Sequence, residues 1–489
     1  MDDTSGFNRY ELSVDFYDEM FDSDGNPHEA SRRLSQVLAQ LAPEELEKLQ
    51  EGVYRRFLHE GITFTVLGDE SSEQIIPIDC VPRILTADEW ETIERGLKQR
   101  LTALNLFLKD VYHSGHCLRD KVVPIDLVLG CPQYCMEMRG VVVPHDVYVS
   151  VCGTDIVRTR EGFAVLEDNL RVPSGVSYML ACRNAMKVAF SGLYRAHKVR
   201  EVADYTKHLY ATLASLAHVG RSPNVAILTP GIYNSAYYKH AFLAGEMGID
   251  LVEGRDLEVR DAVLYARTTA GLRRIDVLYR RIDEDFLDPV TFRGDSMLGA
   301  SGMFHAYRAG NLVLANAPGT GVADDKSLYA FVPEIIRYFL GEDPILSNVE
   351  THLCREPGEL AYTLENLEQL VVKEVGGAGG YGMLVGPQST AHEREQYSRR
   401  LRADPAGFIA QPVLNLSRAP CFIDGGFSPR HVDLRPFVLQ GREGSHVVPG
   451  GFCRVALRRG SLVVNSSQGG GCKDLWVLGD SAQGGAVPC

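Results

Sequence analysis

The sequence predicts a protein of the α/β or α+β class. Apolar residues recur at helical spacing over 28–60 and 87–113, which predicts helices there. Residues 124–170 instead show the period-two alternation of strands. Residues 224–254 follow the order strand, glycine turn, helix, strand, which is typical of a βαβ unit. Because helices and strands are interleaved throughout, the all-α and all-β classes are excluded.

The other elements follow in chain order. A helical pattern returns over 183–218 and again over 326–340, where Lys326 stands at the start. Short apolar runs bounded by turn residues predict further strands. These runs cover residues 277–282, 311–319, 370–375, 381–386, 408–414 and 461–467.

Length and charge limit the functions that fit. At 489 residues the chain exceeds one ordinary core, so we expect about two to four domains. The formal net charge of −14 argues against a nucleic acid or an anionic membrane as partner, since both require concentrated Lys and Arg. No uncharged apolar run reaches about 18 residues, so no transmembrane helix is expected. The acidic start MDDTSGFNRYELSVDFYDEM lacks the apolar core of a signal peptide.

The cysteines indicate the cellular compartment. There are 11, an odd number, and no C-x-x-C motif occurs. Cys131 and Cys135 form a lone pair without a second half, so no zinc site is expected. Reduced thiols are typical of cytosolic proteins, and we therefore predict a cytoplasmic protein.

The stretch LVVKEVGGAGGYGMLVG, residues 370–386, satisfies G-x-G-x-x-G through Gly377, Gly379 and Gly382. A dinucleotide-binding turn would continue into a helix, whereas Met383-Leu384-Val385 continues as a strand. This order predicts a glycine-rich hairpin, and such loops can close over phosphates. Lys373, at the end of the first strand, would point toward the same space. The alternative is a flexible surface hairpin with a solvated lysine.

A second hairpin is predicted over DIVRTREGFAVLEDNLRVPSG, residues 155–175. Glu167 and Asn169 are two residues apart and share one face of a strand. Asp155 can lie opposite Glu167 across the turn. Two carboxylates and an amide oxygen together suit Mg²⁺, because without a cation the carboxylates would repel each other. Alternatively they are surface charges, and Arg171 and Arg183 nearby bind either anions or acidic side chains.

A third stretch, LANAPGTGVADDK, ends at Lys326 before the predicted helix. It could supply a second lysine directed at phosphates. It is not a Walker A loop, because G-x-x-x-x-G-K-[ST] is absent. A turn rich in Gly and Asp before a helix-starting lysine is common, so this stretch alone decides nothing.

Taken together, these residues resemble an ATP-grasp nucleotide site. The standard order is reversed here, since the metal ligands precede the lysines, and this is typical of a circularly permuted member. The chain strongly resembles the circularly permuted ATP-grasp type 2 family from about Tyr17 to Leu478, and is more distantly similar to the synthetase part of glutathionylspermidine synthetases. The resemblance rests on LEDNLRVPSGVSYML, VLYRRIDEDFLDP, NAPGTGVADDK, VVKEVGGAGGYGMLVGP, FIAQPVL, HVDLRPFV and VVNSSQGGGCKD.

The resemblance implies an ATP site with Mg²⁺. It implies phosphate contacts for Lys326 and Lys373, and metal binding by Asp155, Glu167 and Asn169. The phosphate lid would comprise Gly376, Gly377, Gly379, Gly380 and Gly382. The adenine side would comprise Gln411, Pro412, Val413 and Leu414. Candidates to hold the substrate carboxylate and the tetrahedral intermediate are Arg171, Arg281, Arg435 and Arg454, each of which could equally form a structural salt bridge.

The sequence departs from the family pattern at two places. Ala181-Cys182-Arg183 stands where the family usually has Glu-Asn-Arg, and Ser150 stands where His is frequent. Neither is a metal or lysine position, so the departures bear on the acceptor substrate.

The implied fold is a circularly permuted ATP-grasp fold with a Rossmann-like βαβ domain before the ATP-grasp part. We expect five segments: a mainly helical N-terminal region at 1–115, a central sheet segment with the Mg²⁺-ligand hairpin at 116–222, the βαβ domain at 223–315, the lysine and glycine-loop subdomain at 316–425, and a segment returning to the central sheet at 426–489.

The implied activity is an ATP-dependent carboxylate–amine ligase that acts through an acyl phosphate. Two alternatives stay open: an inactive nucleotide-binding or regulatory protein, and a phosphotransferase to a non-carboxylate acceptor. The expected partners are ATP, a carboxylate and an amine, each a small molecule or a peptide, with no nucleic acid and no membrane. A homodimer is an option by analogy alone.

Overall fold

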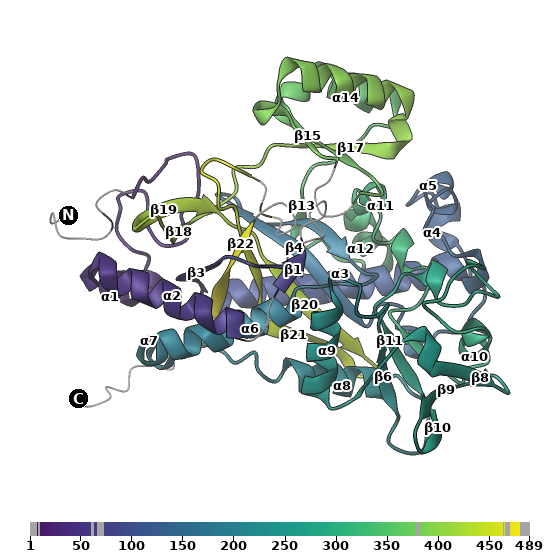
Figure 1. Ribbon diagram of the computed structural model, residues 1–489. Coiled ribbons are helices and arrows are strands. Elements are labelled where there is room, and N and C mark those ends of the chain that lie inside the picture. Colours follow the sequence, from purple (N-terminus) through teal and green to yellow (C-terminus); the bar gives the residue numbers. More distant parts are fainter. Residues whose placement is uncertain are drawn as a thin grey trace.

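The computed structural model describes residues 7, 10–59, 63–65, 73–377, 382–462, 464 and 470–479. It confirms the predicted mixture of helices and strands, which are interleaved along the chain (Figure 1). A seven-stranded sheet forms the centre, and a smaller sheet that includes β15 and β17 projects from it beneath α14.

The central sheet has the strand order β13-β5-β4-β20-β21-β22-β3. Adjacent strands are antiparallel, except that β13 and β5, and β22 and β3, run parallel. The strands are β3 (Ile78–Leu85), β4 (Val151–Thr159), β5 (Gly162–Asn169), β13 (Ser347–Asn348), β20 (Arg435–Gly441), β21 (Gly444–Val455) and β22 (Gly471–Val477).

A parallel sheet of order β12-β11-β6-β7 lies beside the central sheet. Its strands are β6 (Val225–Leu228), β7 (Asp250–Val252), β11 (Val277–Arg280) and β12 (Val313–Ala315). The strand, helix, strand order predicted over 224–254 is present, because helix α9 (Tyr237–Met247) connects the parallel strands β6 and β7. The five predicted segments themselves stay a prediction.

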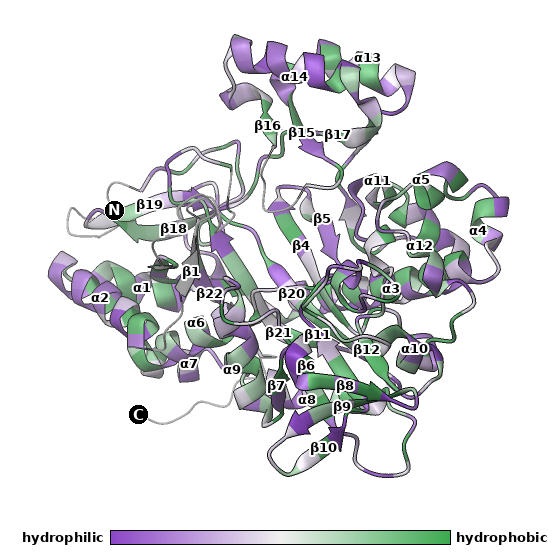
Figure 2. Cartoon of the chain, turned by 45° about the vertical axis from the view of Figure 1, so that its right-hand side comes forward, coloured by the Kyte–Doolittle hydropathy of each residue, from purple (hydrophilic) through white to green (hydrophobic). Residues whose placement is uncertain are grey.

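The small sheet has the order β14-β17-β15-β16 and is antiparallel. Its strands are β14 (His352–Leu353), β15 (Leu370–Glu374), β16 (Leu384–Val385) and β17 (Phe408–Pro412). Helices α13 (Pro357–Glu365) and α14 (Ala391–Ala403) lie on its outer side (Figure 2). Leu370 and Val372 of β15 face these helices in a separate hydrophobic cluster, so the alternate residues Val371 and Lys373 face inward.

The remaining strands form shorter sheets: β1 (Thr63–Thr65) with β2 (Glu73–Ile75), β8 (Leu257–Arg260) and β10 (Gly271–Arg274) on either side of β9 (Val263–Thr268), and β18 (Arg418–Ile423) with β19 (Gly426–His431). The remaining helices are α1 (Arg32–Gln40), α2 (Pro43–His59), α3 (Ala87–Tyr112), α4 (His116–Arg119), α5 (Ile125–Leu129), α6 (Val176–Ala189), α7 (Ser191–Ala196), α8 (Tyr205–Ser215), α10 (Met303–Arg308), α11 (Lys326–Tyr329) and α12 (Val332–Leu340). Within the described ranges, no helix combines the length and apolar character needed to cross a bilayer.

Three regions differ from the sequence predictions. The strands predicted over 124–170 begin only at β4, because α5 and two short 3₁₀ helices, η2 (Met136–Met138) and η3 (Pro144–Asp146), occupy the first part of that range. Pro124, Pro132 and Pro144 interrupt it, and proline cannot donate to a strand ladder. The N-terminal region is helical at α1, α2 and α3, but β3 leaves it and forms an edge of the central sheet. Every residue of β3 is buried, so its IDCVPRIL sequence lacks the alternation that marks a half-exposed strand. The strand predicted over 461–467 is wrong at Ser461, Leu462 and Val464, which are irregular, and its other residues lie outside the described ranges.

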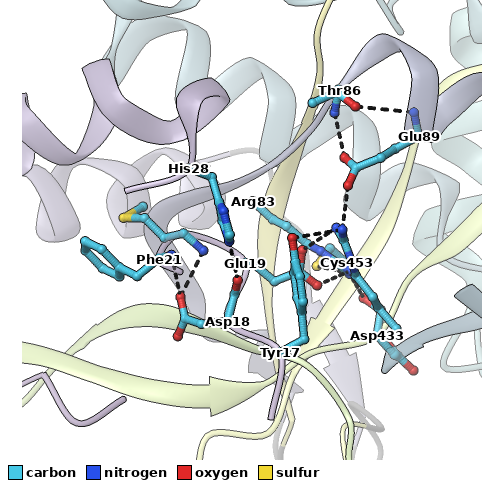
Figure 3. A network of polar contacts seen from close by, with 12 residues as sticks. Tyr17, Asp18, Glu19, Phe21, His28, Arg83, Thr86, Glu89, Asp433 and Cys453 are labelled. Atoms are coloured by element: carbon cyan, nitrogen blue, oxygen red, sulfur yellow. Dashed lines mark hydrogen bonds and ion pairs between the residues drawn. The ribbon is translucent and has the colours of Figure 1, made fainter. Parts of the chain in front are cut away.

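A buried ionic network fixes the N-terminal segment to the central sheet (Figure 3). Arg83 of β3 donates to the Glu19 carboxylate at 2.5 Å, and both side chains are almost fully buried. Arg158 of β4 lies 3.3 Å from the other Glu19 oxygen and donates also to Glu89. Burial alone would raise the pKa of Glu19, but Arg83 and Arg158 outweigh it and leave that pKa lowered. Glu19 is therefore ionised and neutralises buried arginine charge.

Replacing Glu19 should destabilise the fold. Glu19→Gln leaves Arg83 buried without its counter-charge, and we expect the free energy of unfolding to fall by about 3 kcal/mol. Chemical denaturation measures this change. Glu11→Gln is the matched control, because Glu11 pairs with Arg459 at an exposed position and should cost less than about 0.5 kcal/mol. Equal losses in both variants would contradict a structural role for Glu19.

Candidate active site

A cavity of about 540 Å³ lies between the small sheet and the central sheet. The hairpin of β4 and β5 forms one wall, and the inward face of β15, β16 and β17 forms another. The residues on the cavity wall include Asp155, Glu167, Asn169, Arg171, Lys326, Lys373, Gly376, Gly377, Gln411, Pro412, Leu414, Arg435 and Arg454. Most residues predicted for the site therefore share one cavity.

The three candidate metal ligands occupy the predicted positions on the hairpin. Asp155 and Glu167 are direct partners across β4 and β5, and Asn169 lies on the same face as Glu167. Asp168 points to the opposite side, where Arg100 donates to it at 2.7 Å. Among the residues that the structure describes, no group of three or more His, Cys, Asp and Glu could hold a metal. A metal site here would therefore consist of two carboxylates and an amide.

Asp155 is also the centre of a buried arginine cluster. Arg435 donates to both of its oxygens, one of them at 2.8 Å, and Arg454 donates at 2.7 Å. Burial raises the pKa of Asp155, but the two guanidinium groups prevail and hold that pKa well below its usual range. Glu167 is only 3.8 Å from Arg435 and one third exposed, so its oxygens are more accessible.

The four arginine candidates already have partners. Arg454 pairs also with Asp433, and its Nε donates at 2.9 Å. Arg171 pairs with Asp324 at 3.0 Å and lies 3.5 Å from Asp283. Arg281 donates to the Tyr279 hydroxyl and to the Pro173 carbonyl, both at 2.8 Å, and does not reach the cavity wall.

The two lysines bond to neutral oxygens. Lys326, the first residue of α11, donates to the carbonyl of Gly377, and Lys373 donates to the Gln411 amide oxygen at 2.7 Å. Burial lowers the pKa of Lys373 to about 8, although Glu167 opposes this effect. Both lysines line the cavity, and among the described residues neither has a carboxylate within salt-bridge distance.

The glycine-rich stretch is a hairpin. Strand β16 pairs antiparallel with β15, with Val371 opposite Val385. Strand β16, and not a helix, is the first element after Gly382, so the dinucleotide-binding turn is excluded. Gly376 and Gly377 reach the cavity, Gly382 does not, and Gly379 and Gly380 lie outside the described residues.

Three of the four residues predicted for the adenine side line the cavity, and their role stays a prediction. Gln411 at the end of β17, Pro412 and Leu414 lie on the cavity wall. Val413 does not, and its backbone N–H donates to the carbonyl of Gln369 at 3.4 Å.

Sequence reasoning missed several titratable groups on the wall, and burial shifts the pKa of two of them, Asp324 and Lys239, by a large amount. Asp324 lies two residues before Lys326, and burial raises its pKa to about 6 despite Arg171. Asp324 stands in GVADDK, close to the predicted phosphate lysine Lys326, and this proximity in sequence could have indicated it as a site residue. Lys239 lies on α9, and burial lowers its pKa to about 8. No local pattern marks Lys239, because only the packing of α9 brings it to the cavity.

Comparison with known proteins places the chain within a described family. Residues 82–456 match the family described as circularly permuted ATP-grasp type 2. A Synechocystis protein described as uncharacterized is 49% identical over 472 residues, covering 96% of this chain and 98% of the relative. A Mycobacterium tuberculosis protein, also uncharacterized, is 46% identical and covers 98% of this chain and 87% of the relative.

Two further relatives have descriptive names. A Frankia alni protein is 41% identical over 94% of this chain, which spans 54% of that protein; its name, glutamate–cysteine ligase 2-3, is provisional. A glutathione synthetase-like effector of Globodera pallida superimposes with a TM-score of 0.57 at 11% identity, over 90% of this chain and 98% of the effector. That likeness indicates a shared fold.

The arginine cluster around Asp155 yields a stability prediction. Arg454→Met removes the charge that Asp155 and Asp433 share inside the protein, and we expect the free energy of unfolding to fall by about 3 kcal/mol. Arg293→Met, which removes an exposed pair with Asp295, is the control and should cost less than about 0.5 kcal/mol. Urea denaturation at pH 7 compares the two. A loss below about 1 kcal/mol in Arg454→Met would mean that the buried cluster is not stabilising.

Proposed function

The chain belongs to the circularly permuted ATP-grasp type 2 family, and we propose that it is an ATP-dependent ligase that joins a carboxylate to an amine. One observation supports this proposal most directly. Lys326 of α11 and Lys373 of β15 line the same cavity as the Asp155 and Glu167 carboxylates of the β4–β5 hairpin. Two lysines and two carboxylates around one cavity suit a triphosphate bound together with Mg²⁺. The ligase name of the Frankia alni relative supports the same class.

The residues at the proposed metal site fit Mg²⁺. Glu167 and Asn169 project from neighbouring positions on one strand face and offer a carboxylate and an amide oxygen to the cavity. Oxygen ligands of this type are the ones that Mg²⁺ selects. Bound there, Mg²⁺ would supply positive charge to the phosphate oxygens. Because Asp155 is committed to two arginines, we propose that Glu167 is the principal carboxylate ligand.

We assign the lysines to the triphosphate. Lys326 and Lys373 would neutralise phosphate oxygens and so favour departure of ADP. Gly376 would bring its backbone N–H close to the same oxygens, whereas the Gly377 N–H donates to the Glu374 carbonyl at 3.2 Å. Gln411 holds Lys373 from the neighbouring strand, which limits the positions that its ammonium group can take.

The proposed reaction has two steps. A carboxylate oxygen of the substrate attacks the γ-phosphorus, and the bond to ADP breaks, which leaves an acyl phosphate. The amine nitrogen then attacks the acyl carbon, phosphate leaves, and the nitrogen loses a proton. Arg435 lies beside both Asp155 and Glu167, so it is the arginine that we place nearest to the transferred group. Arg454 would act through Asp155 as a positioning residue.

Nucleotide binding tests the site. Calorimetry should detect ATP binding that depends on Mg²⁺, and Glu167→Gln or Lys373→Met should each weaken it by roughly tenfold to a hundredfold, because each removes a charge-assisted contact. Glu161→Gln is the matched control, since Glu161 lies exposed at the turn of the same hairpin. A folded wild-type protein that does not bind ATP would overturn the ligase proposal.

The low pKa of Lys373 predicts proton uptake on binding. At pH 8 the ammonium is about half protonated, and a bound triphosphate would raise its pKa, so roughly half a proton should be taken up. At pH 6.5 Lys373 is already charged, so it should take up no proton when ATP binds. The measurement is the slope of the observed binding enthalpy against the ionisation enthalpy of the buffer.

Lys373→Arg is the control for this measurement. Arginine keeps the positive charge and stays protonated at pH 8. Residue 373 should then contribute no proton uptake, while ATP still binds. Uptake unchanged in Lys373→Arg would assign the proton to another group.

A further inference from the structure

Lys239 is the cavity lysine to which the proposed function gives no role. It lies on α9, on the side of the cavity formed also by Ser235, and by Tyr178 of the adjacent helix α6. Helices α6 and α9 are in contact and lie together beneath the central sheet (Figure 2). The Lys239 ammonium stands 4.8 Å from the centre of the Tyr178 ring. The lysine is thus held at the wall, and its charged end is not directed to open solvent.

The surroundings of Lys239 are cationic. Among the described residues, no carboxylate lies within ion-pair distance of its Nζ atom. Burial lowers its pKa, and Arg281 and Arg435 lower it further. The Nε–H of Arg281 is also buried without a hydrogen-bond partner. Burying an ammonium group beside two guanidinium groups is unfavourable, so the site is one where a bound anion would be stabilised.

The other cavity cations are committed elsewhere. Arg171, Arg435 and Arg454 each pair with at least one aspartate. Lys326 and Lys373 belong to the proposed phosphate side. Among the described cavity residues, Lys239 therefore remains as the cation available to a second ligand.

Lys239 is also separate from the proposed phosphate centre. Lys239 lies on α9, below the central sheet in Figure 2, whereas Lys373 lies on β15, above that sheet. Both lysines line the same cavity. An anion on Lys239 is therefore a different group from the carboxylate that would react beside Glu167. A single substrate that reaches both places must have two acidic groups.

We propose that Lys239 binds a second carboxylate of the acyl donor, so that the substrate activated by this protein is a dicarboxylic acid. This inference rests on the proposed ligase function. Ser235 and the polar edge of Tyr178 lie at the same part of the wall and would flank the bound carboxylate. A monocarboxylate of the same length would leave the Lys239 charge uncompensated and would bind more weakly.

Calorimetry on the full chain with a non-hydrolysable ATP analogue and Mg²⁺ tests the proposal. The probes are L-aspartate, L-glutamate and L-2-aminoadipate, each compared with its side-chain amide. In the wild type, at least one diacid should bind tenfold or more tightly than its amide. Lys239→Met should reduce that ratio to about one, with the affinity for the nucleotide analogue unchanged. Lys239→Arg, which keeps the positive charge, should retain a preference for the diacid.

A stability measurement accompanies the binding assay. The folded pKa of Lys239 lies below the unfolded value, so its charged form destabilises the fold below about pH 8. Lys239→Met should therefore melt at the same temperature as the wild type, or higher, at pH 7. A lower melting temperature would reveal a structural ion pair and overturn the inference.

The remaining outcomes separate the two proposals. Equal diacid preference in wild type and Lys239→Met, with nucleotide binding intact, overturns the dicarboxylate inference and leaves the ligase proposal standing. So does the absence of any diacid preference in the wild type. Weaker nucleotide binding in Lys239→Met would place Lys239 at the nucleotide and also overturn the inference. Failure of the wild type to bind the nucleotide analogue would overturn the ligase proposal, and the dicarboxylate inference with it.

Discussion

The rest of the structure depends on one buried carboxylate that two arginines share. Asp155 belongs to β4, whereas Arg435 and Arg454 belong to β20 and β21, 280 and 299 residues further along the chain. Charged groups inside a protein are tolerated only when they are paired, so the three side chains hold strands from distant parts of the sequence in one arrangement. Arg454 continues the cluster to Asp433, and Arg83 donates to the carbonyl of Asp433 while it binds Glu19. The cavity wall and the N-terminal segment are thus joined through one ionic network.

This network determines which cationic side chains of the cavity are available to bind a ligand. Arginines beside a cavity suggest contacts with a substrate, but here the hydrogen-bonding groups of Arg454 and Arg435 are directed largely to Asp155 and Asp433. The groups left for ligands are lysines, which carry a compact charge and whose pKa responds to burial. Two of these pKa values are lowered to about 8, for Lys239 and Lys373. A bound anion would therefore stabilise the charged form of both lysines.

How much was predictable depended on sequence distance. Asp155 and Glu167 lie on the two strands of one hairpin, so the sequence predicted that they could face each other, and a register shift at Asp155 makes them direct partners. The strand after Gly382 likewise argued against the dinucleotide turn. The partners of Arg435 and Arg454 are remote in sequence, and no local pattern contains them. The position of Lys239 at the cavity could not be predicted from a local pattern either, because it depends on where α9 packs. Strand β3 was missed because burial on both faces removes the alternation that identifies a strand.

The two phosphate-side lysines belong to different bodies of the protein. Lys326 begins α11, whose Leu328 and Tyr329 pack in the main hydrophobic core, whereas Lys373 projects from the small sheet, whose outer face has a hydrophobic cluster of its own. A ligand that touches both lysines acts as a crosslink between two separately packed units. Its residence time should then follow the opening of the interface between those units more than the strength of any single contact.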